Sequence, residues 1–263
     1  MQLEKKLKVK TVSALPRYYL AASYQRLHQL DQSLRWYKEA LALYREQNNA
    51  EGQALALYGI GGIQQSRLDY AQAIKSYEKV IAVLHAQPQS SVAANALNSL
   101  AEIAIIQDQY EKAEQYLQQS IHIAKAAQFD SGLAVYLANM GNVAQWRQDY
   151  PLSVSYYQQA IVLAEKMNMP GHVSNFNMFL ARVYATWGQY PKALAILKAQ
   201  EVFLQKHKLY PELMQIHLDF GAIYLKLSEY ERASQYYKQA LSVIEQYDLQ
   251  IFKPAALNGL GNI

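Results

Sequence analysis

The chain has 263 residues, of which 51% are hydrophobic and 17% are charged, and its formal net charge is +4. A nucleic-acid-binding protein usually concentrates its basic residues on one face or in one groove. Here the basic residues are spread along the chain, apart from the run Lys5, Lys6, Lys8 and Lys10, so the sequence predicts no nucleic-acid partner. The absence of cysteine excludes disulfides, thiolate metal sites and a cysteine nucleophile.

The N-terminal segment, residues 1–16, carries lysines but lacks an apolar stretch long enough for the core of a signal peptide. No later segment approaches the roughly 20 apolar residues that a membrane-spanning helix needs. We therefore expect no membrane partner and a cytoplasmic location. Residues 1–13 are expected to be a lead-in or the end of a preceding helix.

From residue 14 onward, one pattern recurs at a constant spacing to the end of the chain. A tyrosine column is followed three residues later by a small residue, and four residues after that by a large one such as Tyr77 or Leu117. Upstream of each tyrosine stands a second column of small residues, which includes Ala21, Gly61 and Gly261. The tyrosine column, which sets the period at 40, consists of Tyr70, Tyr110, Tyr150, Tyr190 and Tyr230.

Within each unit the apolar residues are spaced by three or four positions, as Ile60 and Gly61 are from Leu57, which is the spacing of an amphipathic helix. The sequence thus predicts an all-α fold with six helix pairs over residues 14–253. Residues 254–263 read as the first part of a seventh repeat without its second helix. Because an uncovered packing face exposes apolar surface, we expect a piece of a longer protein that could self-associate through this uncapped repeat.

This pattern resembles the tetratricopeptide repeat (TPR), which has a small residue after a large one on helix A, and tyrosine, alanine and an aromatic residue on helix B. The period of 40 resembles the long-repeat subgroup, which includes kinesin light chains and bacterial peptide-sensing regulators. The usual tryptophan of the first helix is replaced by leucine, or by the polar Asn177 and His217. The resemblance implies a right-handed superhelical solenoid of antiparallel helix pairs, with the A helices on its concave side.

In the resembled family, groove-facing residues occupy the second, fifth, sixth, ninth, twelfth and thirteenth places of helix A. Asparagine recurs there although it is a mediocre helix former. Its amide both donates and accepts hydrogen bonds, which suits an extended peptide backbone. Arg182 could take a carboxylate, and aromatic residues could supply apolar pockets. The predicted peptide-binding residues are Tyr58, Asn95, Asn98, Glu102, Asn139, Asn142, Trp146, Asn175, Phe179, Arg182, Asp219 and Lys226.

Other interpretations compete with this one. The asparagines could instead be solvated or hydrogen-bond between neighbouring repeats. Gly59 and Gly62 lie outside the small-residue column and would leave a notch beside Tyr58 if they face the groove. No strand precedes these glycines, so a phosphate-binding loop is disfavoured.

The histidines show no metal-ligand spacing, and no local catalytic motif occurs. The sequence therefore predicts no enzyme, no cofactor and no metal. Two functions remain open. One is a scaffold that holds a protein or peptide in the concave groove. The other is a ligand-sensing regulatory segment that controls an attached signalling or effector domain outside this chain.

Overall fold

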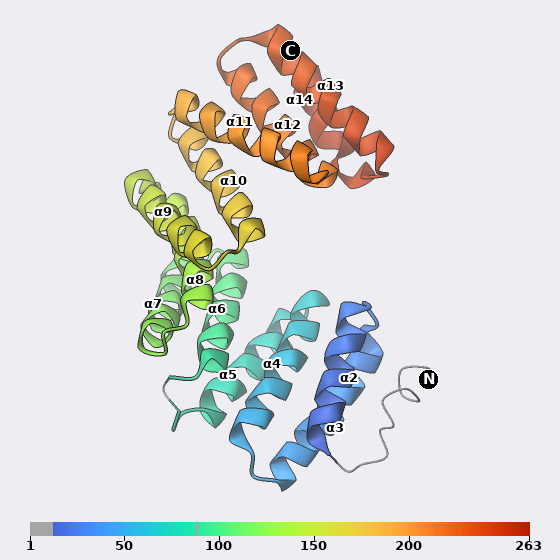
Figure 1. The fold of residues 1–263 in the computed structure, drawn as a ribbon, viewed down its shortest axis with the longest axis vertical. Coiled ribbons are helices and arrows are strands. Elements are labelled where there is room, and N and C mark those ends of the chain that lie inside the picture. The colour runs from blue at the N-terminus through green and yellow to red at the C-terminus, as the bar shows by residue number, and fades with distance from the viewer. Residues whose placement is uncertain (1–12, 88) are drawn as a thin grey trace. The chain divides into compact units, whose positions relative to one another are not determined.

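The computed structural model describes residues 13–87 and 89–263, so the predicted lead-in falls outside the description except for Ser13. Within these residues the chain is all-α, with no strand (Figure 1), which confirms the predicted fold class. The helices are α2 (Ala14–Arg26), α3 (Leu30–Glu46), α4 (Ala50–Ser66), α5 (Tyr70–Val83), α6 (Ser91–Ile106), α7 (Tyr110–Ala126), α8 (Asp130–Trp146), α9 (Tyr150–Lys166), α10 (Pro170–Thr186), α11 (Tyr190–His207), α12 (Tyr210–Lys226), α13 (Tyr230–Gln246), the 3-10 helix η1 (Gln250–Phe252) and α14 (Lys253–Gly261).

Contacts between residues divide the chain into two compact units, and the boundary along the chain falls within α8, between Val143 and Ala144. In the first unit, α2 packs with α3, α4 with α5 and α6 with α7. In the second unit, α9 packs with α10, α10 with α11, α12 with α13 and α13 with α14. Helices therefore contact mainly their neighbours in sequence, as a repeat array requires.

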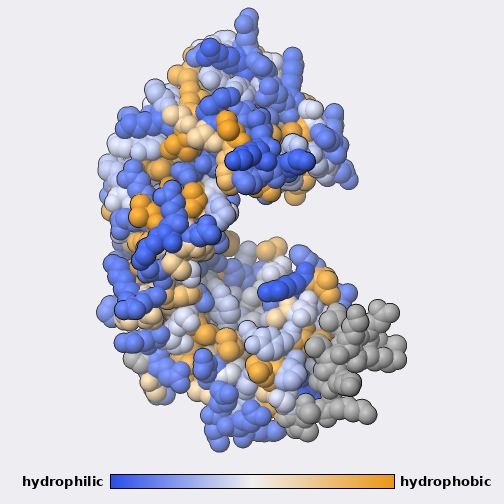
Figure 2. Space-filling model, in the orientation of Figure 1, coloured by the Kyte–Doolittle hydropathy of each residue, from blue (hydrophilic) through white to orange (hydrophobic). Residues whose placement is uncertain are grey.

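The two repeat columns form the core of the helix pairs. Ala73, Ala113 and Ala193 of the small-residue column have no exposed surface, and the large residues Leu117 and Tyr157 are also fully buried. Small residues let two helices approach closely, and the large residue one turn later fills the space beside them. Hydrophilic and hydrophobic residues are mixed over the visible surface of both units (Figure 2).

Apart from the one between α5 and α6, the links between helices recur at half the repeat period and share one backbone conformation. In the first link, the His28 N–H donates to Gln25 O (3.0 Å) and the Gln29 N–H donates to Tyr24 O (2.9 Å). This pair of bonds is the Schellman motif, which closes a helix with one left-handed residue. A 17-residue helix followed by a three-residue link accounts for half of the 40-residue period. The left-handed residues are His28, Asn48, Leu68, Asp108, Gln128, Gln148, Asn168, Gly188, Lys208, Ser228 and Asp248.

Replacing Leu68 by glycine is expected to raise the free energy of unfolding by about 1 kcal/mol, because a left-handed conformation strains a side chain with a Cβ atom. Leu68 has a φ of 61° and is 70% exposed, so little packing is lost. Urea denaturation followed by circular dichroism measures the change. Asn48→Gly is the matched control and should have a smaller effect, because asparagine tolerates this conformation. An equal or lower stability of Leu68→Gly would contradict the prediction.

Tyr37 occupies the space that the sequence predicted to be a notch. A Cβ atom added to Gly59 would overlap the Tyr37 ring, and one added to Gly259 would likewise overlap the ring of Tyr237. Gly59 therefore faces the Tyr37 ring of the preceding helix pair and leaves no notch. Gly62 differs, because an added Cβ there would meet only the Gln25 amide nitrogen at 3.5 Å and a tyrosine hydroxyl at 4.0 Å.

The connection between α5 and α6 departs from the regular link. Helix α5 has 14 residues and ends at Val83, whereas α6 begins at Ser91. The last turn seen in the 17-residue B helices is missing from α5.

None of the helices that the structure describes is both long and apolar enough to cross a membrane.

Candidate functional site

A network of side-chain hydrogen bonds joins α6 to α8. The Asn98 amide donates to Glu102 Oε1 (2.9 Å), and the Asn139 amide donates to Asn98 Oδ1 (2.8 Å). Asn139 also lies 3.4 Å from the same Glu102 oxygen. Asn98 is only 7% exposed, and burial strengthens hydrogen bonds by lowering the local dielectric. The network therefore couples the third repeat to the fourth.

The neighbouring asparagines extend this network. The Tyr136 hydroxyl donates to Asn95 Oδ1 (2.6 Å), and the Asn142 amide lies 3.4 Å from Asn139 Oδ1. Burial raises the pKa of Tyr136, so its hydroxyl keeps the proton that it donates. Hydrogen bonding between repeats, one of the alternatives left open by the sequence, is thus present. A peptide-binding role for these amides stays a prediction.

Arg182 of α10 contacts a carboxylate from within the chain. Its Nε donates to Asp219 Oδ2 of α12 (3.1 Å), and the Gln215 amide donates to the other Asp219 oxygen (3.2 Å). Burial raises the pKa of the Asp219 carboxyl, and the Arg182 guanidinium opposes that rise. The guanidinium also lies 6.0 Å from the centre of the Phe179 ring.

A hollow of about 640 Å³ opens beside this ion pair. Ala181, Ala185 and Ile223 contribute apolar surface to it, and Lys226 brings a second cation. Lys226 is exposed, and it forms no ion pair with any other residue that the structure describes. Three predicted residues thus meet at one hollow. The full lining is Gln145, Ala181, Arg182, Ala185, Thr186, Tyr190, Leu197, Asp219, Ala222, Ile223 and Lys226.

The remaining predicted residues are dispersed. Tyr58 is half-buried against Tyr77, with ring centres 5.6 Å apart. Phe179 stacks on Tyr157 at 6.1 Å and stays 39% exposed. Trp146 is 61% exposed and Asn175 is also exposed. None of these four residues lines the hollow.

The sequence interpretation missed several residues of the hollow, although the repeat register contained the signal. Gln145 holds the twelfth place of its repeat, Thr186 the thirteenth and Ala222 the ninth, which are all places of the predicted groove face. The preference for asparagine and charged residues passed over them. An alanine is uninformative by type, and it becomes a lining residue only because its position leaves space.

A polar contact between α11 and α12 was also missed as a unit. Glu201 and His217 are each 6% exposed, and Glu201 Oε1 lies 3.4 Å from His217 Nε2. The other Glu201 oxygen accepts from Lys198 Nζ at 2.6 Å. Both ring nitrogens of His217 lack a hydrogen-bond partner with proper geometry. Burial lowers the pKa of His217 below its ordinary value, and the neighbouring Glu201 carboxylate opposes this shift without cancelling it.

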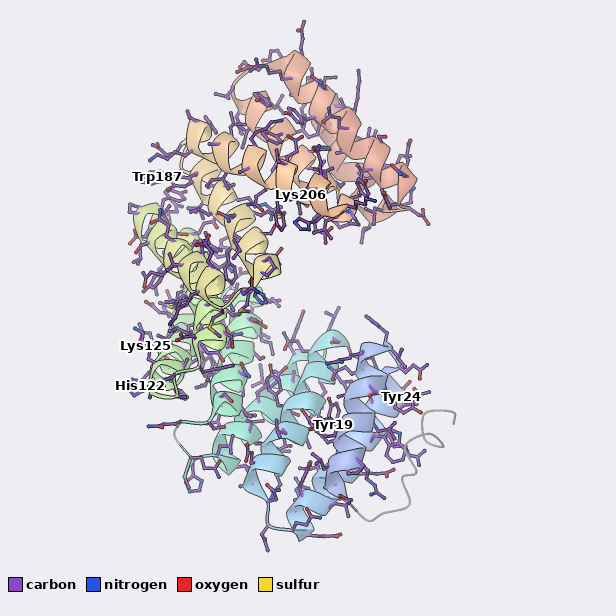
Figure 3. All side chains as sticks on the ribbon, viewed as in Figure 1. Tyr19, Tyr24, His122, Lys125, Trp187 and Lys206 are labelled. Atoms are coloured by element: carbon purple, nitrogen blue, oxygen red, sulfur yellow. The ribbon has the colours of Figure 1, made fainter. Side chains whose placement is uncertain are left out.

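A second hollow, of about 750 Å³, lies between the B helices α5 and α7. It opens where α5 ends early, and it is lined by Leu84, Leu97, several glutamines and two histidines, His85 and His122. Figure 3 labels His122 and Lys125 on α7, and of these two His122 lines the hollow. The B-helix positions were outside the predicted groove, so the sequence interpretation did not include them.

The described residues contain no group of three or more histidine, aspartate or glutamate side chains placed to hold a metal ion. Several aromatic side chains of the second unit stack on one another. Trp187, which follows α10 (Figure 3), stacks between Tyr150 and Tyr184 with centre distances of 6.1 and 6.4 Å.

Comparison with known proteins agrees with the helix pairs. One tetratricopeptide repeat family model matches residues 13–86 and 53–126, and a second matches residues 215–247. The chain belongs to the tetratricopeptide repeat family. These TPR matches cover the first three helix pairs and most of the sixth. No curated protein matches the sequence at a significant level.

Several solved structures share the TPR fold. RapI in its apo form has a TM-score of 0.67 and 16% identity, with 93% of this chain and 89% of RapI covered. A putative kinesin light chain with TPR-like repeats from Podosopora anserina has a TM-score of 0.59 and 18% identity, with 76% and 99% covered. A chain of the APC/C hetero-tetramer Cut9–Hcn1 has a TM-score of 0.74 and 16% identity, with 98% of this chain and 44% of that chain covered. At these identities the likeness shows the fold alone.

Proposed function

We propose that this TPR protein is an interaction scaffold that binds a peptide segment of a partner protein on its A-helix face. The observation that carries the proposal is the hollow on α10 and α12. Its volume of about 640 Å³ falls within the range of roughly 300–1,000 Å³ typical of ligand sites. An apolar floor with a few polar groups at the rim also suits a peptide side chain.

The charges of the lining favour an acidic ligand group. The hollow has two cations, Arg182 and Lys226, and one carboxylate, Asp219. Because Asp219 already holds Arg182 in place, Lys226 is the cation that a ligand could pair without breaking a contact. Asn175 is exposed on the same helix as Arg182, and its amide could bind the peptide backbone.

Selection of peptides from a random display library on the purified protein tests this proposal. We expect the bound pool to be enriched in aspartate and glutamate, and Lys226→Glu should weaken the selected peptides by tenfold or more. Lys238→Glu is the matched control, because Lys238 is exposed on α13 and does not line the hollow. Equal weakening by both variants, or by neither, would contradict a site at this hollow.

The second proposal is a regulatory role, in which ligand binding changes the packing of neighbouring repeats and so controls an attached domain. The polar contact of Glu201 and His217 favours it, because His217 is buried without a hydrogen-bond partner and its desolvation penalty lowers the cost of separating the two helices. A ligand that changes amide exchange in helices it does not touch would support this role.

A further inference from the structure

The repeat provides its own reference for the contact between α11 and α12. Glu201 stands in a column where the other five repeats have leucine or isoleucine, and His217 stands where four other repeats have leucine. Two largely apolar columns are thus interrupted at this junction by buried residues that are costly to bury. The column of His217 also contains the polar Arg17 and Asn177, but these two are only partly buried. The counterparts of Glu201 are Leu41, Ile81, Ile121, Ile161 and Leu241, and those of His217 are Leu57, Leu97, Leu137 and Leu257.

Helix α11 has further buried polar groups on its other side, where it contacts α10. Gln200, which stands where other repeats have alanine, valine or serine, accepts a hydrogen bond from the Ser174 hydroxyl at 2.8 Å. These two residues are satisfied, whereas His217 is not. An unpaired buried polar group carries its full desolvation penalty. The junction between α11 and α12, which contains His217, is therefore a weak point of the second unit.

We propose that the contact between α11 and α12 is a proton-sensitive joint, at which protonation of His217 loosens the sixth repeat from the fifth. The imidazolium would enter a site where Glu201 is already bonded to Lys198. A second cation there would lose its hydration and be repelled by the Lys198 ammonium, and these costs together exceed the attraction of Glu201. Protonation thus favours the open junction, in which the ring contacts water.

The groups around His217 come from two helices. Helix α11 supplies Glu201 and Lys198, and α13 supplies Tyr236, whose ring centre lies 5.9 Å away. Burial raises the pKa of Tyr236, so it stays neutral in this range. The charged residues of the other helices that contact α12 are paired elsewhere, Arg182 of α10 with Asp219 and Lys253 of α14 with Glu245.

The direction of the pH effect follows from linkage. Burial holds the pKa of His217 below its ordinary value of 6.5 in the closed junction. Above pH 6.5 the ring is neutral whether the junction is closed or open, and closure has its full stability. As the pH falls from 6.5 toward the lowered pKa, the open form binds the proton first, and stability of the closed form is lost.

The joint connects with the proposed ligand site through α12. Asp219 and Lys226 lie on the same helix as His217, so loosening that helix would move one wall of the hollow and weaken ligand binding at acid pH. This consequence rests on the proposed function, whereas the joint itself does not.

Hydrogen exchange of backbone amides, read by mass spectrometry without any ligand, tests the joint directly. After correction for intrinsic exchange rates, lowering the pH from 7.5 to 5.5 should raise the opening constant of α12 and α13 by about five- to tenfold. His217→Gln keeps a polar group but cannot titrate here, so its opening constant should change less than twofold. The same pH dependence in both proteins would overturn the proposal.

Two further variants keep the test decisive if His217→Gln folds poorly. The double variant Glu201→Leu, His217→Leu restores the apolar columns and should open less than the parent at both pH values, with no pH dependence. His172→Gln changes an exposed histidine on α10 and should retain the pH response of the parent. A pH response that persists in the double variant would assign it to another group.

Discussion

Replacing Gly59 by alanine is expected to lower the free energy of unfolding by about 2 kcal/mol. An added methyl group would overlap the Tyr37 ring, which is 3% exposed and bonded through its hydroxyl to Gln25 at 3.0 Å. Displacing a buried ring typically costs about 1–3 kcal/mol, which outweighs the gain of up to about 1 kcal/mol from the better helix former.

Gly62→Ala is the matched control three residues further along α4. Space for a methyl group exists at Gly62, so the helix gain should appear undiminished, and the variant should be more stable by up to about 1 kcal/mol. Urea denaturation of the three proteins measures both changes. Two shifts of the same sign would show that ring packing does not decide which glycine is needed.

Replacing Arg182 by alanine should lower the free energy of unfolding by about 2 kcal/mol at neutral pH. The change leaves Asp219 without its cation, and its side chain is only 17% exposed. Breaking a fully buried ion pair costs about 3–5 kcal/mol, and we expect less because the Arg182 side chain is 39% exposed. The measurement is urea denaturation of parent and variant across a series of pH values.

The pH series separates charge from packing. The pKa of Asp219 is already raised above 3.8 by burial, and removal of Arg182 raises it further. As the pH falls through this raised pKa, the carboxyl becomes neutral and the difference between the two proteins should shrink. Asp219→Asn in the Arg182→Ala background should recover most of the stability at neutral pH. A difference independent of pH and unrelieved by Asp219→Asn would indicate lost packing instead.

These experiments bear on how the predicted groove residues are to be used. Asn98, Asn139 and Arg182 all have partners within the chain, so their replacement changes stability and would confound a binding assay. Lys226 is exposed on the same face, and its replacement is the cleaner probe of ligand binding.

The sequence alone determined the all-α fold and the register of its repeats. A helix pair must place small residues where two helices cross and large residues beside them, so Ala73 and Tyr77 recur at a fixed distance along the chain and can be read without coordinates. The constant repeat period has the same origin, since each helix and its link repeat the same local hydrogen bonds.

Only the tertiary structure decided which side chain fills which space. Gly59 is explained by a ring from another helix pair, the hollow beside Lys226 by alanines whose type carries no signal, and the amide network by partners one repeat away. Glu201 and His217 could be seen as departures from their columns, but that they face each other at 3.4 Å depends on how α11 packs against α12. A local pattern fixes where a residue points along its own helix, whereas the contacts that give it a role come from residues distant in the chain.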